Sequence, residues 1–500
     1  MKKWSQGIVW LLVAVLVLGA IPPLPVTATG DAYGQIPWWT LEPIPTRPPE
    51  TAAELGFFPI TSASDLNMMR WNPSADFRLM RNISLPYGWE PIGTADAPFT
   101  GTFDGQCFTI SGLRINDEHL DDVGLFGVIS GATIQNLTIR GSIRGNHNVG
   151  ALAGRAVRGS TIINVTNYAN VHGFFNVGGI VGAMGDAVVT HYRGSNFGAS
   201  PSGYVSMIMN STNHGEVFGR YKETTHIFES VFLGGIVGQI CFRVTIQNAL
   251  NTGRVGGIGT TLVGGIVGNV GLTHTHRHNV GVYILNSANT GNIVGLSRVG
   301  GIAGALSNAT VQGSFNTGDV TTSALDMPMR GATSWSPFAG GGIAGSIVQG
   351  TRITHSYNTG NVTSLGAFAE IRDPHNRNAT IIVHVGGGSV GGIVGTAHGE
   401  GRTTIRYTYN TGAVTSAVGD SGWERGRLVG GIIGATTHIN SAREGISQTD
   451  SFSSNVVLSN HIHGNDEFST VRVIAGEASY VGSTIASRSH VIMADNFASI

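Results

Sequence analysis

Charge is scarce in this sequence. Only 29 Lys and Arg residues and 30 Asp and Glu residues occur among 500, and the formal net charge is −1. Three of the basic residues are lysines, Lys2, Lys3 and Lys222. Nucleic acids and anionic membranes are bound through dense basic patches, which the sequence lacks. The composition therefore predicts no nucleic-acid partner.

Cysteine is almost absent. Cys107 and Cys241 are far apart in the chain, and a disulfide needs Cα atoms within about 7 Å of each other. We expect both to be small buried residues without a redox or metal role.

Long hydrophobic runs are lacking except near the start. Lys2 and Lys3 precede the apolar stretch Ile8–Ile21, and Val26-Thr27-Ala28 is a typical small-residue cleavage site. We predict a signal peptide over residues 1–28. The chain would then be secreted or held at the cell surface, with wall association left open, and would not be inserted in a membrane after cleavage.

Catalytic motifs are also missing. The sequence contains no His-Glu-x-x-His metallopeptidase motif, no phosphate-binding loop and no dinucleotide fingerprint in a βαβ context. Residues Gly387–Gly391 match Gly-x-Ser-x-Gly, but no helix is expected after them, as that motif requires. No catalytic residue and no cofactor is predicted. A polysaccharide lyase or hydrolase stays as the alternative, although no carboxylate pair can be named for it.

Glycine, in contrast, is abundant and regularly placed. The phrase Gly-Gly-Ile-x-Gly or a close copy returns at intervals of about 28 residues that are lengthened by insertions. Such a period indicates a repeat architecture in which each unit is buried against its neighbours. The seven full copies are Gly178–Gly182, Gly234–Gly238, Gly264–Gly268, Gly300–Gly304, Gly341–Gly345, Gly391–Gly395 and Gly430–Gly434.

A second phrase, Asn-Thr-Gly, lies between copies of the first. It begins at Asn251, Asn289, Asn316, Asn358 and Asn410, and a Val or Ile strand signal follows it. Since Asn and Gly tolerate positive φ, we interpret it as a turn repeated in each unit. The β-branched residues and short apolar runs predict strands rather than helices.

Together these phrases predict an all-β fold, a right-handed parallel β-helix with an N-terminal capping region. The Ile residues and the Asn residues of successive coils would each form a ladder. Thr61 to Met69 is the one short helix expected. The predicted organisation is a signal peptide (1–28), a Pro-rich linker (29–59), a cap (60–116), repeats with insertions (117–445) and a degenerate terminal coil (446–500).

The two phrases resemble the GLUG repeat of bacterial exported surface proteins. The run Pro91-Ile92-Gly93, Phe99–Gly105 and Val123–Gly127 follows the order found upstream of such repeats. The same block occurs in adhesin-like proteins and in the non-catalytic part of some immunoglobulin A metallopeptidases. The resemblance covers about residues 60 to 445, and it implies an architecture and an extracellular location rather than one activity.

Two metal sites are conceivable from the sequence. His274, His276 and His278 alternate, so on a strand they would share one face and could bind zinc or copper, although no fourth ligand is evident. The alternative is an insertion loop whose histidines are simply solvated. The acidic stretch Asp117–Asp122 could hold calcium, or be a polar loop between strands. No metal site is predicted.

Recognition is expected from the insertions Gly185–Glu229, Leu325–Pro337 and Phe368–His384. They carry aromatic side chains suited to sugar rings or to a protein partner. The candidate ligand-binding residues are Tyr192, Tyr204, Tyr221 and Trp335. We therefore expect a structural or adhesive protein that binds an extracellular glycan or a host or matrix protein.

Overall fold

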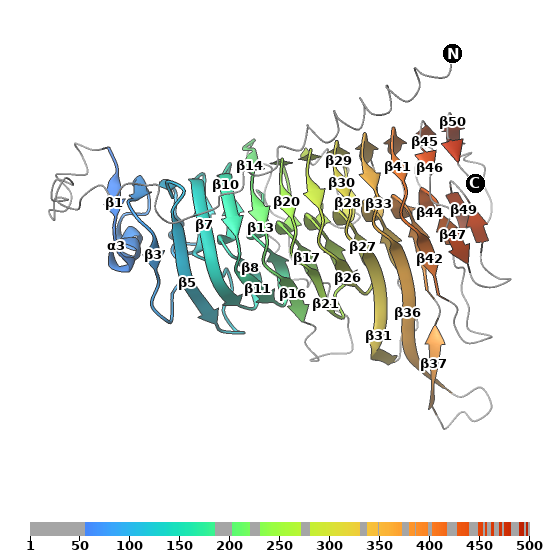
Figure 1. Cartoon of the computed structure of the whole chain (residues 1–500), viewed down its shortest axis with the longest axis horizontal. Helices are drawn as coiled ribbons and strands as arrows, with labels where there is room; N and C mark the ends of the chain where they lie inside the picture. Colours follow the sequence, from blue (N-terminus) through green and yellow to red (C-terminus); the bar gives the residue numbers. More distant parts are fainter. Residues whose placement is uncertain are drawn as a thin grey trace, which may run out of the picture. The chain divides into compact units, whose positions relative to one another are not determined.

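The chain forms a parallel β-helix, as the repeats predict. The computed structural model describes residues 56–185, 203–220, 231–271, 281–330, 338–348, 350–372, 380–385, 387–398, 403–417 and 428–439, and the strands from Thr449 onward. Strands of successive coils pair in parallel in three sheets of 32, nine and ten strands, which we call sheets A, C and B. In Figure 1 the coils follow one another in sequence order from β1 to β50.

Sheet A contributes three strands to a typical coil. The N-terminal strands are β1 (Phe58–Ile60), β2 (Phe77–Leu79), β3 (Ile83–Ser84), β4 (Thr102–Asp104), β5 (Thr109–Asn116), β7 (Thr133–Arg144), β10 (Thr161–Asn167) and β11 (Asn170–Gly173). The first strands of the later coils are β14 (Ser206–Met209), β19 (Val244–Gln247), β24 (Val282–Leu285), β29 (Ala309–Gln312), β34 (Arg352–Thr354), β40 (Thr404–Arg406), β45 (Thr449–Ser453) and β50 (His490–Ala494).

The second strand of each later coil is two residues long and usually ends in Asn. These strands are β15 (Thr212–Asn213), β20 (Leu250–Asn251), β25 (Ala288–Asn289), β30 (Phe315–Asn316), β35 (Tyr357–Asn358), β41 (Tyr409–Asn410), β46 (Val456–Val457) and β51 (Phe497–Ala498). The third strands are β16 (Val217–Arg220), β21 (Val255–Ile258), β26 (Ile293–Gly295), β31 (Val320–Arg330), β36 (Val362–Arg372), β42 (Val414–Ser416) and β47 (Ile462–Gly464).

Sheets C and B follow in every coil and are joined by the glycine phrase. Sheet C consists of β8 (His147–Gly150), β12 (Phe175–Gly178), β17 (Phe232–Gly234), β22 (Leu262–Gly264), β27 (Arg298–Gly300), β32 (Ala339–Gly341), β38 (Ser389–Gly391), β43 (Leu428–Gly430) and β48 (Thr470–Arg472). Sheet B consists of β6 (Phe126–Ser130), β9 (Ala153–Val157), β13 (Val181–Met184), β18 (Val237–Ile240), β23 (Val267–Val270), β28 (Ala303–Ser307), β33 (Ala344–Val348), β39 (Val394–His398), β44 (Ile433–Ile439) and β49 (Ala475–Val481).

The isoleucine of the phrase forms the expected ladder in the core. In all seven copies it is fully buried, and its amide donates to the matching isoleucine carbonyl of the next coil in pairs such as Ile266 and Ile302, 2.9 Å apart. The phrase requires glycine because neighbouring coils approach each other closely there. A Cβ on Gly265 would lie 2.1 Å from the Gly301 carbonyl oxygen and 2.3 Å from Cγ of Asn289.

A ladder of seven buried asparagines runs through the same core. In the first six, Nδ2 donates to Oδ1 of the asparagine in the next coil at 2.7 or 2.8 Å. Each Nδ2 also donates to the backbone oxygen two residues further along its own chain, as Asn289 does to Gly291 at 2.7 Å. Members of this inner ladder are Asn167, Asn213, Asn251, Asn289, Asn316, Asn358 and Asn410.

The predicted reason for Asn-x-Gly was wrong. Neither Asn289 nor Gly291 has positive φ. Glycine is needed because consecutive coils touch there: a Cβ on Gly291 would lie 2.1 Å from the Gly253 carbonyl oxygen. The positive-φ asparagines belong to an outer position, where Asn248 has φ of 54° and its Nδ2 donates to Asn210 Oδ1 at 3.0 Å.

The N-terminal end carries the predicted short helix, α3 (Ala63–Met68), followed by the 3₁₀ turn η1 (Met69–Trp71). Ser62 caps α3 by accepting from the Asp65 amide at 3.1 Å. Leu66 and Met69 are fully buried in the core cluster that continues through the coils. This end of the core is therefore covered by apolar side chains.

The structure also tests the predictions on the two cysteines and shows the strands that two of the insertions form. Cys241 is buried as expected, but Cys107 is exposed, at a left-handed residue with φ of 63°. The insertions Leu325–Pro337 and Phe368–His384 partly extend the strands: β31 and β36 each reach 11 residues, and β37 (Thr380–Val385) pairs antiparallel with β36. Figure 1 shows these three strands extending beyond the neighbouring coils.

The predicted signal peptide (1–28) and most of the predicted linker (29–59) lie outside the described residues. No helix in the described part of the chain is long and apolar enough to cross a bilayer.

The inner ladder gives a stability prediction. In Asn289→Ala, Asn251 Nδ2 loses one of its two acceptors and Asn316 Oδ1 loses its ladder donor in the core. We expect the free energy of unfolding to fall by about 2–4 kcal/mol, because each orphaned buried polar group costs about 1–3 kcal/mol. Urea unfolding measures this. Thr290→Ala, at the exposed next residue, should stay within about 0.5 kcal/mol of the unsubstituted protein. Equal losses in the two variants would contradict the assignment.

Candidate functional site

The outer face of sheet A carries aromatic rings on consecutive coils. Phe315, Tyr357 and Tyr409 each precede an inner-ladder asparagine, so they project outward where the asparagine projects inward. Their rings stack face to face: Phe315 and Tyr357 lie 4.9 Å apart at 2°, and Tyr357 and Tyr409 lie 4.7 Å apart at 5°. These distances equal the spacing of paired strands, so the sheet itself sets the stack.

A second stack lies beside the first. His355 and Tyr407 have their ring centroids 4.9 Å apart at 28°, and Tyr407 is 54% exposed. We call these five residues (Phe315, Tyr357, Tyr409, His355 and Tyr407) the aromatic strip.

His355 and Tyr407 occupy a left-handed backbone position. Their φ angles are 51° and 55°, and the equivalent residues of earlier coils include Asn248, Asn286 and Gly313, which tolerate such φ. A bulky ring in this conformation is unfavourable by about 1–3 kcal/mol and persists where the surroundings hold it. Strain retained at an exposed aromatic residue points to function rather than to folding.

Two phenols of the strip, those of Tyr357 and Tyr409, are held in their neutral form. Burial raises the pKa of Tyr357, and burial together with the neighbouring Tyr357 raises the pKa of Tyr409. Because the rings cover one another's faces, a ligand would meet ring edges and phenol hydroxyls, which donate and accept hydrogen bonds.

Few carboxylate side chains lie in the described part of these coils. Residues 231–318 contain no Asp or Glu. Between residues 203 and 417 the described acidic side chains are Glu216 and Asp319. Glu216 forms an ion pair with Arg254 at 3.3 Å, and Asp319 Oδ1 accepts from the Asn361 amide at 2.9 Å. These two carboxylates, each already engaged, give no acid–base pair of the kind that glycosidases use.

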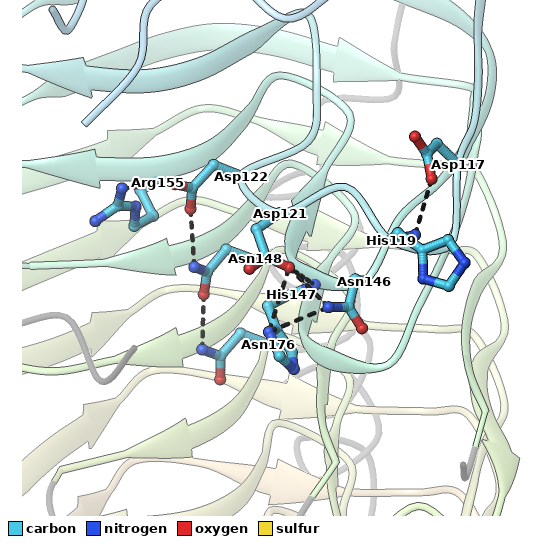
Figure 2. A network of polar contacts seen from close by, with 9 residues as sticks. All are labelled: Asp117, His119, Asp121, Asp122, Asn146, His147, Asn148, Arg155 and Asn176. Carbon is cyan, nitrogen blue, oxygen red and sulfur yellow. Dashed lines mark hydrogen bonds and ion pairs between the residues drawn. The ribbon is translucent and has the colours of Figure 1, made fainter. Parts of the chain in front are cut away.

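The acidic stretch Asp117–Asp122 is bound by protein donors (Figure 2). Asp121 Oδ1 accepts from Asn146 Nδ2 at 2.8 Å and from the His147 amide at 3.1 Å. Asp122 accepts from Asn148 Nδ2 at 2.8 Å and forms an ion pair with Arg155 at 2.5 Å.

This polar network continues as a further short asparagine ladder. Asn176 Nδ2 donates to Oδ1 of Asn148 in the preceding coil at 2.8 Å. Glu118 forms an ion pair with Arg144. Among the described residues no three His, Cys, Asp or Glu side chains are grouped to hold a metal ion. The hydrogen bonds of Asp121 and Asp122 to protein donors fit the alternative of a polar loop between strands.

Few of the predicted ligand-binding residues can be located. Tyr204 is 56% exposed, with its Cβ next to Gly159. Phe338, directly after the insertion Leu325–Pro337, is buried. Ser389 of the Gly-x-Ser-x-Gly match is buried in β38, inside sheet C, without the strand–turn–helix setting of a nucleophile. The predicted residues outside the described part of the chain are Tyr192, Tyr221, Trp335, His274, His276 and His278.

The aromatic strip was missed from the sequence, although a signal for part of it exists. The residue before Asn-Thr-Gly is Phe315, Tyr357 or Tyr409 in three phrases and Leu250 or Ala288 in two. An aromatic residue recurring at one repeat position predicts an outward stack once the following asparagine is known to be inside.

Comparison with known proteins gives limited similarity. No family model matches the chain. A 70-residue stretch, 13% of this chain, is 47% identical to halomucin of Haloquadratum walsbyi (strain DSM 16790 / HBSQ001) and spans 1% of that protein.

Two solved structures align with this chain at low similarity. One, from Bacteroides ovatus, is described as a candidate immunoglobulin A1 protease. It aligns over 69% of this chain and 84% of its own, with a TM-score of 0.40 and 17% identity. The other, described as an IgA1 protease, aligns over 70% of this chain and 21% of its own, with a TM-score of 0.37 and 17% identity. Neither alignment carries information on activity or substrate.

The tyrosine stack predicts a loss of stability in alkali. A tyrosine whose pKa is raised in the folded state stabilises the fold fully below the unfolded pKa of about 10, and that contribution is lost as pH rises through the folded pKa. We expect Tyr357→Phe to lose less unfolding free energy than the unsubstituted protein between about pH 9 and pH 11. Urea unfolding at several pH values measures this. Tyr283→Phe, at an exposed tyrosine outside the strip, should follow the unsubstituted protein. Identical pH slopes for all three proteins would refute the prediction.

Proposed function

We propose that this chain is an exported structural and adhesive protein of the cell surface or the extracellular medium. The N-terminal sequence, with Lys2 and Lys3 before the apolar run Ile8–Ile21, supports export. The repeat phrases, which resemble those of bacterial surface proteins, support the same location. The protein has no catalytic activity of its own.

Its binding surface is the aromatic strip on sheet A. The observation that carries this proposal is the strained backbone of His355 and Tyr407 at positions where other coils have Asn or Gly. The strip offers apolar ring edges beside phenol hydroxyls, and Arg352 is exposed on the same coil as His355. Aromatic side chains with a polar end suit both sugars and protein surfaces. The ligand is therefore an extracellular glycan or a host or matrix protein.

A rigid scaffold suits this role. The core fixes every coil through its ladders, so the spacing of the outward rings is set before a ligand arrives. Binding to a preorganised surface avoids the entropy cost of ordering it.

Binding is tested on an array of glycans and matrix proteins with the exported protein and its variants. Tyr407→Asn should reduce saturable retention by about tenfold, as loss of a central interface tyrosine does. The same variant should not lower the unfolding midpoint, because Asn is favourable at this left-handed position. Tyr87→Asn, at a tyrosine that is 81% exposed near the N-terminus, is the matched control and should bind normally.

The outcomes separate the alternatives. Retention that survives both Tyr407→Asn and His355→Asn would move the binding site away from the strip. Retention on no spot would contradict adhesion. Release of new reducing ends from an arrayed polysaccharide would instead support the enzyme alternative.

A further inference from the structure

A row of exposed side chains runs along sheet A with one residue from each coil. Each member directly follows a residue at the inner-ladder position. In all members after the first, the amide donates to the preceding coil, as Thr290 N does to Asn251 O at 2.8 Å. We call this set the exposed row: Arg140, Tyr168, His214, Thr252, Thr290, Thr317, Thr359 and Thr411.

The N-terminal end of the row is a continuous stack. The Arg140 guanidinium lies 4.1 Å from the ring centroid of Tyr168, which stacks on His214 at 4.6 Å and 19°. His214 Nδ1 and Thr252 Oγ1 are 2.8 Å apart. A cation held over an aromatic face in this way is fixed in position while its N–H donors stay available.

The other arginines near the stack are paired with carboxylates, whereas Arg140 is not paired with any described carboxylate. Arg144 is paired with Glu118, and Arg254 is paired with Glu216. Arg140 has no hydrogen bond or ion pair with a residue of the described part of the chain, and the exposed row contains no carboxylate. Burial and then the nearby Arg140 lower the pKa of His214, so its ring is neutral at pH 7 and provides hydrogen bonds rather than charge.

The C-terminal part of the row is uniform. Five exposed threonines follow one another on five coils, Thr252 to Thr411, each spaced from the next by the distance between paired strands, about 4.8 Å. A line of hydroxyl groups at a fixed repeat matches a ligand that itself repeats and carries hydroxyl groups.

A peptide strand is a poor occupant. The row lies within sheet A, where the backbone groups of each coil pair with both neighbours in registers such as Asn251 with Asn213 and Asn289. Recognition by strand addition needs an open sheet edge, so it cannot occur here. The ligand must be read by side chains alone.

We propose that the exposed row binds an anionic polysaccharide along the coil axis, with a carboxylate or sulfate group on Arg140 and sugar hydroxyl groups on the threonines. A guanidinium binds such oxyanions with two parallel N–H donors. The inference takes from the proposed function only that the ligand is extracellular, and it does not use the aromatic strip.

The test measures binding of dextran sulfate, polygalacturonate and uncharged dextran to the full chain by biolayer interferometry. Dextran sulfate or polygalacturonate should bind and uncharged dextran should not, and the charged ligand that binds identifies the anionic group. Arg140→Gln should weaken binding at least fivefold. The matched control is Arg78→Gln, because Arg78 lies 4.2 Å over the Phe57 ring but outside the row, and it should bind normally.

A second variant tests the hydroxyl part of the row. Thr290→Ala with Thr317→Ala should weaken binding of long chains more than that of oligosaccharides too short to reach these coils from Arg140. Tyr87→Asn, at an exposed tyrosine outside both the row and the aromatic strip, should leave binding of the charged ligand unchanged. Because Arg140 lies outside the aromatic strip, failure of this inference would leave the proposed function standing.

Several results would overturn the proposal. These are equal weakening by Arg140→Gln and Arg78→Gln, binding of neither charged polysaccharide, or equal binding of dextran. Binding of polyglutamate as strong as that of the polysaccharides would assign the row to acidic polypeptides instead.

Discussion

The contact between the inner asparagine ladder and the glycines of the Gly-Gly-Ile phrase is the constraint on which the rest of this structure depends. An asparagine amide has a donor and an acceptor at a fixed separation, so a ladder is satisfied only when coils repeat at the strand spacing. The corner glycine opposite must lack a Cβ, since one on Gly265 would lie 2.3 Å from Cγ of Asn289. Asn-Thr-Gly and Gly-Gly-Ile are thus two halves of one contact.

This constraint explains how irregular insertions coexist with a regular surface. Successive ladder asparagines are separated by as few as 27 and as many as 52 residues, yet their side-chain hydrogen bonds keep nearly constant length. Every residue adjacent to a ladder asparagine is therefore placed in register whatever the insertion length. The aromatic residues that precede the asparagines and the threonines that follow them therefore line up from coil to coil, because the asparagines between them are fixed.

Much of the fold could be predicted from the sequence because its determinants recur. The buried isoleucine ladder, the asparagine ladder and the helix capped by Ser62 follow from repeated phrases and one capping signal. The explanation of Asn-x-Gly by positive φ was wrong. Positive φ and close contact between coils both favour glycine, so the sequence alone does not distinguish the two reasons. Cys107 was wrongly expected to be buried, because the sequence does not reveal that this residue has a left-handed backbone and is exposed.

The candidate surfaces were harder to predict, because stacking of Tyr357 on Tyr409 depends on register between coils rather than on either residue alone.

The most direct test of the central constraint is hydrogen exchange of side-chain amides in protein labelled with ¹⁵N only at asparagine. If the inner ladder holds the coils together, the Nδ2 protons of its seven members should exchange slowly, at rates set by opening of the core. Exposed asparagines such as Asn286 and Asn292 should exchange at the rates of free amides. Rapid exchange of all asparagine side chains would show that the ladder does not hold the coils in register. The explanation of the aromatic strip and of the exposed row would then fail as well.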